Sequence, residues 1–496
     1  MGAYADVGRR GYQSAQICLE ELIVRLRSEA SSTLTHDEVE RLIAEEGREV
    51  MRRLMQAHLE QRSAHEDVVE GVVGADGVER RHHRRSSRGL MTVFGPVTVA
   101  RVAYGARGHG SLHPLDGELN LPEEVYSHGL RRLAAEEASR GSYDQTVDAI
   151  VRTTRTEVPK RQTEELVRRA ACDFDGFYRA RAPTAVSTDN LLVLSVDGKG
   201  IVMRREDLLP ATRKLADESS HKLAKRLSRG EKRGRKRMAT VAAVYDLVAQ
   251  PRTALDVLQD LAPARSTSTP RPRAKNKRVW ARLEPSLEAV VEEVFQEALR
   301  RDPLRQRHWV VLVDGNAHQL ETLRRAARRH GVKIEIVLDF IHVLEYLWRA
   351  AWCFHQEGDP AVEDWVHQRA LSILRGSSSA VAAGIRRSAT KRGLRGAARR
   401  GADACVEYLV GHRKYLRYRR YLRTGLPIAT GVIEGACRHL VRDRMEITGA
   451  RWSVDGAEAI LRLRSLRSSG DFEHYWAFHL QQEQQRNHSI RFAQAA

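Results

Sequence analysis

The chain has 496 residues, with 83 lysines and arginines against 64 aspartates and glutamates, and a formal net charge of +19. Its length predicts about three domains rather than one, and a hydrophobic content of 42% is enough to build buried cores. Lysine and arginine release condensed counterions when they contact phosphates, so a surplus of this size indicates a polyanionic partner. We expect a nucleic acid; the alternative is a charge excess that only keeps the protein soluble.

The composition also argues against several classes of protein. The five cysteines are scattered and form no CxxC pair, which argues against a disulfide framework or a zinc site and favours a reducing cytosol. No eighteen apolar residues follow one another, and the first residues contain no apolar signal core. These features predict a cytoplasmic protein without a membrane span.

Residues 1–88 are expected to form helices followed by a basic loop. Apolar residues keep helical spacing over 17–26, and residues 35–38 predict a capping box that opens a second helix. Residues 80–85 are arginines and histidines, which predict a solvated basic loop rather than a metal site. After this loop, residues 92–99 predict two short strands about a Gly-Pro turn.

Residues 89–182 are expected to contain this hairpin and then short helices over 127–172. A polar turn at 152–156 separates two of the helices, and the second begins near Lys160 and Arg161. Two short helices across a tight turn are compatible with a helix-turn-helix whose second helix presents basic groups to DNA. Any small helical bundle gives the same pattern, so both interpretations stay open.

Four continuous apolar runs of strand length predict a sheet that helices cover on both faces. They occupy residues 191–196, 238–245, 309–313 and 334–338, and residues 321–329 can form the crossover helix between the last two. The first, third and fourth runs are followed directly by Asp197, Asp314 and Asp339.

Two basic insertions interrupt this predicted sheet. Residues 222–237 contain nine lysines and arginines against Glu231 alone, and residues 265–282 are rich in Ser, Thr, Pro, Lys and Arg. Both patterns predict mobile loops. From the first insertion we expect DNA contacts by Lys232, Arg233, Arg235 and Lys236.

Two strands that end in Asp-Gly place Asp197 and Asp314 at the carboxyl edge of the sheet, where ligands of open α/β sheets bind. Neighbouring strands lie about 4.8 Å apart, so both carboxylates can reach one cation. Oxygen ligands suit Mg²⁺, and Glu434, near the start of a later helix, offers a third carboxylate for a two-metal site. For any single aspartate, a role as turn former or helix cap is the alternative.

Several segments of the chain carry a resemblance to a known family. They are Ser195–Met203, Val311–Asn316, Leu338–Trp348, Thr430–Ala436, Gly449–Trp452 and Gly456–Arg464. Together, and in this order, they resemble bacterial insertion-sequence transposases of the ISKra type. The resemblance implies an α/β fold with large all-α parts: an RNase H-like mixed sheet flanked by helices, a helical insertion before the last carboxylate, and a mainly helical N-terminal DNA-binding region.

The resemblance also implies an activity, cofactor and partners. Asp197, Asp314 and Glu434 would be the catalytic residues and would hold Mg²⁺, with Mn²⁺ as a substitute. The partners would be DNA (terminal inverted repeats and target DNA) and at least one further copy of the chain, and the protein would act at the bacterial nucleoid. The expected domains are 1–88, 89–182, 183–342 (first part of the catalytic core), 343–425 (helical insertion) and 426–496 (C-terminal part of the core, with Glu434).

Asp339 is the rival for the second carboxylate. In an RNase H-like sheet its strand lies one place further from Asp197, so Asp339 would start about 10 Å from Asp197 against about 5 Å for Asp314. We therefore choose Asp314. Asp339 and His342 resemble the Asp-x-x-His element of Mutator-like transposases; the alternative is an N-cap aspartate beside a satisfied histidine.

The last expected contacts are with DNA. Lys199 follows the first aspartate, and Arg451 and Trp452 follow Glu434. Trp452 either stacks on an unpaired base at the transposon end or is a buried core residue. Two other functions stay open: a nuclease on the same fold that cleaves DNA without joining it, and a captured or inactive transposase that only binds DNA.

Overall fold

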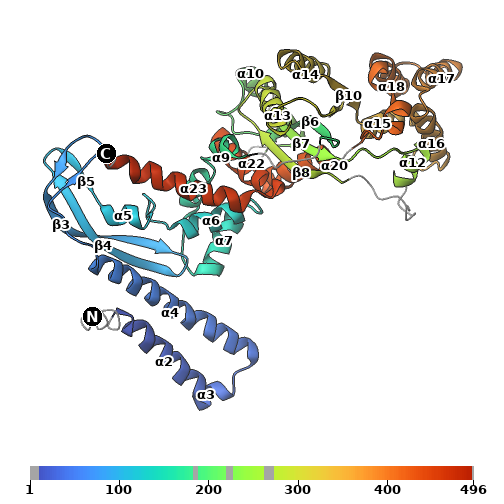
Figure 1. Cartoon of the computed structure of the whole chain (residues 1–496). Helices are drawn as coiled ribbons and strands as arrows, with labels where there is room; N and C mark the ends of the chain where they lie inside the picture. Colours follow the sequence, from blue (N-terminus) through green and yellow to red (C-terminus); the bar gives the residue numbers. More distant parts are fainter. Residues whose placement is uncertain (1–10, 183–187, 219–226, 262–272, 430, 494–496) are drawn as a thin grey trace. The chain divides into compact units, whose positions relative to one another are not determined.

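The computed structural model describes residues 11–182, 188–218, 227–261, 273–429 and 431–493. The chain forms two compact units, shown in Figure 1. Unit 1 comprises Met1–Ala180 and Asp471–Ala496, and unit 2 comprises Arg181–Gly470. The first boundary between the units falls between Ala180 and Arg181, and the boundary expected from the sequence is at 182. The C-terminal segment differs, because residues 471–496 belong to unit 1 and not with residues 426–470.

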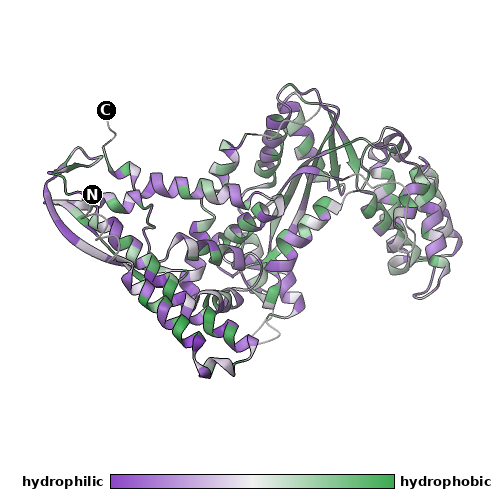
Figure 2. Ribbon diagram, turned by 60° about the horizontal axis from the view of Figure 1, so that its bottom comes forward, coloured by the Kyte–Doolittle hydropathy of each residue, from purple (hydrophilic) through white to green (hydrophobic). Residues whose placement is uncertain are grey.

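Unit 2 is built on a mixed five-stranded sheet in the order β10-β9-β6-β7-β8. Its strands are β6 (Leu191–Val202), β7 (Lys236–Leu247), β8 (Lys275–Arg282), β9 (Trp309–Val313) and β10 (Ile334–Leu338). Strands β6, β7 and β8 form an antiparallel meander, while β9 and β10 run parallel to β6. The strands carry hydrophobic residues, as Figure 2 shows, and the four runs expected from the sequence are all strands.

The fifth strand, β8, corrects the prediction of a loop over residues 265–282. Its two arginines are paired: Arg278 contacts Glu297 of α13 (Leu287–Arg301) at 2.6 Å, and Arg282 lies 3.5 Å from Glu293 of the same helix. The backbone N–H groups on its free edge donate to Ser465 and Ser469 of α22 (Val454–Ser469). A covered edge explains how a basic segment becomes a strand without exposing unpaired donors. Residues 262–272 of the same prediction lie outside the described residues.

The other basic insertion is also partly ordered. Residues 219–226 lie outside the described residues, but α11 (Arg229–Arg233) follows and β7 begins at Lys236. Further helices of the sheet region are α10 (Pro210–Glu218), α12 (Ala254–Leu261) and α14 (Ala317–Arg329), the last of which is the expected crossover between β9 and β10.

A block of helices follows β10, as expected for residues 343–425. It consists of α15 (Phe340–Ala351), α16 (Ala361–Leu374), α17 (Ser378–Lys391), α18 (Arg400–Gly411) and α19 (Tyr418–Arg423). The chain then returns to the sheet through α20 (Gly431–Ala436), a π-helical segment (Cys437–Arg442) and α21 (Asp443–Met445) before α22. We call α15–α19 the helical insertion.

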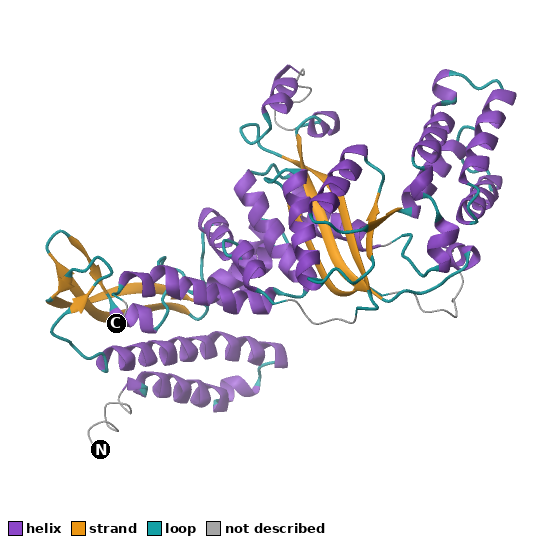
Figure 3. Cartoon of the chain, turned by 45° about the horizontal axis from the view of Figure 1, so that its top comes forward, coloured by secondary structure: helices purple, strands orange, loops and turns teal. Residues whose placement is uncertain are grey.

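Unit 1 begins with a helical hairpin and a three-stranded sheet, seen in Figure 3. The hairpin contains α2 (Gln13–Arg27), the short α3 (Glu29–Ser32) and α4 (His36–Ala64), which opens with the predicted capping box. The sheet contains β3 (His82–Thr92), β4 (Gly95–Ala106) and β5 (His109–Leu112) in that order, beside the small pair β1 (Val72–Val73) and β2 (Glu79–Arg80). The expected basic loop at 80–85 is therefore mostly strand, because β3 pairs with β4 along its whole length.

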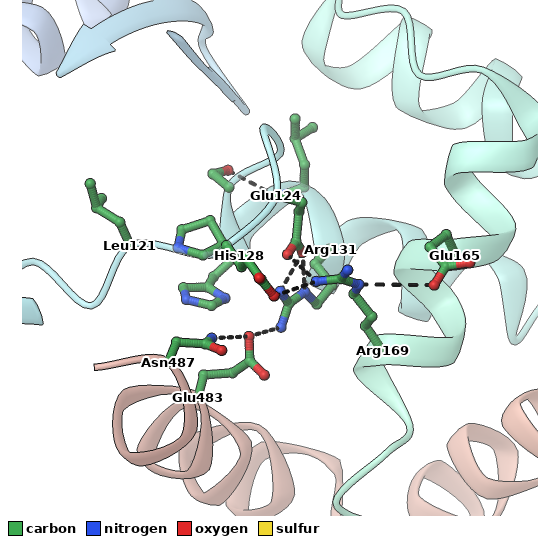
Figure 4. Close-up of polar contacts among 12 residues, drawn as sticks. Leu121, Glu124, His128, Arg131, Glu165, Arg169, Glu483 and Asn487 are labelled. Atoms are coloured by element: carbon green, nitrogen blue, oxygen red, sulfur yellow. Dashed lines mark hydrogen bonds and ion pairs between the residues drawn. The ribbon is translucent and has the colours of Figure 1, made fainter. Parts of the chain in front are cut away.

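The helices of unit 1 that follow the sheet are α5 (Pro114–Glu118), α6 (His128–Ala138), α7 (Tyr143–Thr154), α8 (Lys160–Ala170) and α9 (Phe174–Ala180). The C-terminal helix α23 (Phe472–Asn487) joins them through a buried cluster, drawn in Figure 4. Arg131 of α6 is fully buried and pairs with Glu124 and with Glu483 of α23, the latter at 2.5 Å. Glu124 also pairs with Arg169 of α8 at 2.8 Å. The cluster ties α23 to the helices of unit 1, which explains the placement of residues 471–496.

Among the residues that the structure describes, no helix combines the length and apolar character needed to cross a membrane.

Candidate active site

Three neighbouring strands align Asp197, Asp314 and Asp339. Asp314 and Asp339 directly follow the carboxyl ends of β9 and β10, but β6 continues beyond Asp197 to Val202, so the expectation that the first strand ends at Asp197 is wrong. Paired residues of β6 and β9 differ by 117 in number (312 − 195), and those of β9 and β10 differ by 25 (338 − 313). Continuing both registers past the last pairs sets Asp314 opposite Asp197 and Asp339 opposite Asp314. Residues opposite one another on parallel strands share a face of the sheet. We call these three residues the carboxylate row.

Asp197 lies near the middle of β6 and is half-buried. Its Oδ1 accepts a hydrogen bond from the backbone N–H of Gly198 at 2.6 Å, and its Oδ2 accepts one from the Sγ of Cys437 at 3.1 Å. Burial raises the pKa of the Cys437 thiol, and the nearby charge of Asp197 raises it further. Cys437 is therefore a neutral donor that helps to fix the orientation of Asp197.

Asp314 follows β9 and begins a tight turn. Its Oδ1 accepts a hydrogen bond from the backbone N–H of Asn316 at 2.9 Å. Gly315 has φ +99°, and a Cβ there would lie 3.3 Å from side-chain atoms of both Tyr408 and His412. Only glycine adopts this conformation without strain, so the turn and the packing both require the Asp-Gly sequence.

Asp339 is the most buried member of the carboxylate row, with 6% of its surface exposed. It is the N-cap of α15, and its Oδ1 accepts a hydrogen bond from the backbone N–H of Ile341 at 2.8 Å. Burial raises the pKa of Asp339 to about 6; Glu434 and Asp197 add to this rise, while His342 opposes it. Asp339 therefore interacts electrostatically with Asp197 and with Glu434.

His342 contacts a different carboxylate from the one expected. Its Nδ1 lies 3.6 Å from Glu345, one turn further along α15. The charge of His342 lowers the pKa of Asp339, so the two residues do interact electrostatically. Within the described part of the chain, however, the structure shows no hydrogen bond between them, and Asp339 acts as the helix cap named as the alternative.

Glu434 is exposed on α20, and the π-helical segment Cys437–Arg442 follows directly. A π-helix is rare and often marks a functional site because it changes which face the following side chains present. Helix α20 packs against β6 and β7, and the charge of Glu434 contributes to the raised pKa values of Asp339 and Cys437, so Glu434 lies near the carboxylate row. Within the described residues, none of Asp197, Asp314, Asp339 and Glu434 forms an ion pair with lysine or arginine.

The helical insertion supports the strand ends that carry Asp314 and Asp339. Tyr408 of α18 donates to the carbonyl of Asp314 at 2.8 Å, and His412 donates to the carbonyl of Gly315 at 3.0 Å. Tyr418 of α19 donates to the carbonyl of Leu338 at 3.0 Å. Sequence reasoning missed these supporting residues and Cys437, because they lie between about 80 and 240 residues from their partners and no local pattern marks them.

A basic cavity of about 720 Å³ opens in unit 2 between β6, α11 and the segment after the π-helix. Arg229, Lys232, Arg233 and Lys236 line it, with Glu446 as its acidic residue. Lys236 lies 3.8 Å from Glu446, while the other three cations form no ion pair with the described carboxylates. Two of the expected DNA contacts, Lys232 and Arg233, are therefore available to an anion. Arg235 is 7% exposed and does not line the cavity, and Lys199 lies on β6 opposite Ala239.

The expected helix pair of unit 1 is present as α7 and α8. Together with α6 the two pack as three helices around buried residues that include Leu166 and Val167. Arg161 is exposed near the start of α8, and Lys160 is exposed but pairs with Asp144 at 2.7 Å. These contacts describe a small bundle of three helices, and they do not decide between the bundle and the helix-turn-helix.

Trp452 is buried, with 5% of its surface exposed. Its indole N–H donates to the carbonyl of Met445 at 3.0 Å, and the Arg444 guanidinium lies 4.8 Å from the ring centroid. This corrects the expectation that Trp452 offers a face to a DNA base; the core role named as the alternative is the one observed. The adjacent Arg451 is exposed.

In the described residues, one group of three possible metal ligands has its atoms within 4.8 Å of one another: Cys172, Asp173 and His479. Asp173 already accepts hydrogen bonds from His479 and from Arg486, both at 2.7 Å. A carboxylate with a bidentate arginine has little capacity left for a cation. No three of the carboxylates Asp197, Asp314, Asp339 and Glu434 have ligand atoms that all lie within 4.8 Å of one another. In contrast to Asp173, none of these four pairs with an arginine among the described residues.

No known protein-family model matches the chain, and the comparison with curated proteins finds none that matches it.

Proposed function

We propose that this chain is a DNA transposase of the DDE kind, which cleaves and joins DNA with Mg²⁺ held by Asp197, Asp314 and Glu434. The observation that carries the proposal is the group of carboxylates at one sheet edge. They come from separate elements, β6, the turn after β9 and α20, and none has a basic ion-pair partner among the described residues. Such a group of negative charges is disfavoured unless a cation binds it.

The topology of unit 2 supports an RNase H-like core. Three antiparallel strands are followed by two that run parallel to the first, in the order β10-β9-β6-β7-β8. The strand before Asp314 lies beside that of Asp197, and the strand before Asp339 lies one place further out. This is the arrangement that the family resemblance implies, and the helical insertion falls before Glu434, as the resemblance also implies.

The donor set fits a hard divalent cation. The candidate ligands are all carboxylate oxygens, which suit Mg²⁺ and Mn²⁺. The two-metal chemistry that such a site supplies is activation of water or a 3′-hydroxyl and stabilisation of the leaving oxygen. The chain's own contribution is to fix the ligands: Cys437 and Gly198 orient Asp197, and Tyr408 holds the carbonyl of Asp314.

Basic surfaces in both units support DNA as the substrate. In unit 2 the basic cavity presents Arg229, Lys232 and Arg233 without ion-pair partners in the described chain. In unit 1 the exposed start of α8 presents Arg161. Phosphate contacts of this kind position a duplex, while sequence is read by base-edge contacts. We assign end recognition to α6–α8 and backbone binding to the cavity.

The test uses the full chain and a labelled duplex that carries the DNA flanking the gene. With Mg²⁺ the wild type should cleave this duplex and join its 3′ ends to a second DNA. Asp197→Asn and Glu434→Gln should lose both products yet bind the duplex with unchanged affinity. Glu357→Gln, an exposed carboxylate in the loop after α15, is the matched control and should retain activity. Cleavage without joined product would favour the nuclease, and binding without either product by the wild type would refute the enzyme.

The second carboxylate is tested in the same assay. We expect Asp314→Asn to abolish cleavage and Asp339→Asn to reduce it less, since Asp339 is buried as a helix cap. Loss of activity in Asp339→Asn together with retention in Asp314→Asn would transfer the ligand role to Asp339.

A further inference from the structure

Helices α2 and α4 form an antiparallel hairpin with an apolar side that the described residues leave uncovered. Seven large hydrophobic residues of these two helices are between 38% and 68% exposed: Ile17, Leu19, Ile23, Val24, Ile43, Met51 and Leu54. Hydrophobic (green) residues follow both helices in Figure 2. An amphipathic surface helix normally buries its apolar stripe, so the hairpin has more apolar surface than its own packing uses.

Each helix carries the repeat of a helical bundle. On α2 the residues Ala15, Leu19, Leu22 and Leu26 are spaced by four, three and four. On α4 the residues Ile43, Gly47, Val50, Leu54 and Ala57 are spaced by four, three, four and three. This average of 3.5 residues is the spacing of a seam that packs against neighbouring helices.

The hairpin buries only part of each stripe. Ala15, Leu22, Val50 and Ala57 are buried, but Leu19 is 45%, Ile43 45% and Leu54 43% exposed. On each helix, the exposed residues are rotated about the helix axis in the same direction from the residues at the α2–α4 contact. Because the helices are antiparallel, equal rotations bring them to one side of the hairpin. We call this side, made by Leu19, Ile23, Ile43, Met51 and Leu54, the open face.

Gly47 lies in the middle of the open face. A glycine inside a helix costs about 1 kcal/mol relative to alanine, and a Cβ at Gly47 would meet no atom within 4 Å. Packing within the described chain therefore does not explain the glycine. A helix from outside that approaches closely at this position does explain it.

We propose that the open face is a dimer interface, on which the α2–α4 hairpin of a second copy of this chain completes an antiparallel four-helix bundle. An isologous pair places the same stripe on both partners, so the missing halves of the two seams are supplied symmetrically. Covering five aliphatic side chains that are each nearly half exposed removes on the order of 400 Å² of apolar surface per partner. A standard interface buries about 800 Å² per partner and is a little over half apolar, so the open face meets the requirement of a stable dimer.

The test is the mass of the full chain in solution without DNA, measured by sedimentation and light scattering at micromolar concentrations, because interfaces of standard area have dissociation constants from micromolar downwards. The wild type should be a dimer. Leu19→Glu and Leu54→Glu should each raise the dissociation constant of the dimer at least tenfold and so favour the monomer. Val24→Glu is the matched control, because Val24 is 68% exposed but lies about 140° round α2 from Leu19, and it should stay dimeric.

A fourth variant separates interface loss from misfolding. Gly47→Met meets no atom of its own chain, so the monomer should keep its helical circular dichroism while the dimer weakens. A dimeric Leu54→Glu variant, or equal effects of Val24→Glu and Leu54→Glu, would overturn the proposal. So would a wild type that is monomeric over the whole concentration range. The measurement needs neither DNA nor Mg²⁺, so its outcome is independent of the proposed activity.

Discussion

Replacing Arg131 by methionine should destabilise unit 1 strongly. The Arg131 guanidinium is fully buried; its Nε donates to Glu124 at 2.9 Å and its Nη1 to Glu483 at 2.5 Å. Burial alone would raise the pKa of Glu483, but the charge and the hydrogen bond of Arg131, together with the charges of His479 and Arg486, lower that pKa below its usual value. Removing one partner of a buried ion pair costs about 3–5 kcal/mol. Because one cation here serves two carboxylates, we expect Arg131→Met to lose about 5 kcal/mol.

Hydrogen exchange of the full chain measures this loss in unit 1 alone. A decrease of about 5 kcal/mol in opening free energy accelerates exchange by between three and four orders of magnitude in α6, α8 and α23. Peptides from β9 in unit 2 are the internal control and should be unchanged. The triple variant Arg131→Met, Glu124→Gln, Glu483→Gln should recover most of the protection, since no buried charge remains unpaired. If exchange in Arg131→Met rises by less than tenfold, the cluster does not hold α23 in place and our account of unit 1 is wrong.

Two further predictions follow from the charges of the chain. Burial, together with the Arg131 charge, lowers the pKa of His128 from 6.5 to about 4. Between these two pH values the unfolded state binds a proton that the folded state does not bind. The free energy of unfolding of unit 1 should therefore fall by up to about 3 kcal/mol as the pH falls from 6.5 to 4. Thermal unfolding across this range should show that slope in the wild type and a flatter one in His128→Asn. In the basic cavity, the double variant Lys232→Ala, Arg233→Ala should reduce the salt dependence of DNA binding by nearly two ions, measured by titrations at several salt concentrations. Arg41→Ala on α4 is the control, and its salt dependence should equal that of the wild type. If the double variant also keeps the salt dependence of the wild type, the cavity does not bind DNA.

The sequence predicts those elements whose signal is local. Each of the four apolar runs becomes a strand, and the capping box at Thr35 forms because its partners are three residues apart. The fifth strand was missed for the opposite reason. Its basic residues look like a loop, and only their pairing with Glu297, together with the cover of α22, makes a strand possible. Both depend on residues that are distant in sequence.

The same limit applies to the residues around the candidate site. The ends of apolar runs can be found from composition, so Asp197, Asp314 and Asp339 are all identifiable, although β6 itself continues past Asp197 to Val202. Their ranking rests on side-chain direction and burial, which the chain sets through remote contacts such as that of Tyr408 with Asp314. The role of Trp452 cannot be predicted from the sequence either, because its burial also depends on remote contacts. A tryptophan that stacks on a base and one that fills a core can have the same local sequence.

Asp339 shows what the structure adds to this argument. From strand spacing alone it lies one strand too far from Asp197 to share a cation, yet the charges of Asp197 and Glu434 both raise its pKa. A carboxyl with a pKa of about 6 is still mostly ionised at neutral pH, so the raised pKa reflects burial and neighbouring negative charge and does not by itself exclude Asp339 as a ligand. Asp314 has no comparable burial, since its side chain is half-exposed on the turn. The ranking therefore rests on geometry: the strand of Asp339 lies one place further from β6 than that of Asp314, and Asp339 is the N-cap of α15, where it suits holding the carboxyl end of β10 in position.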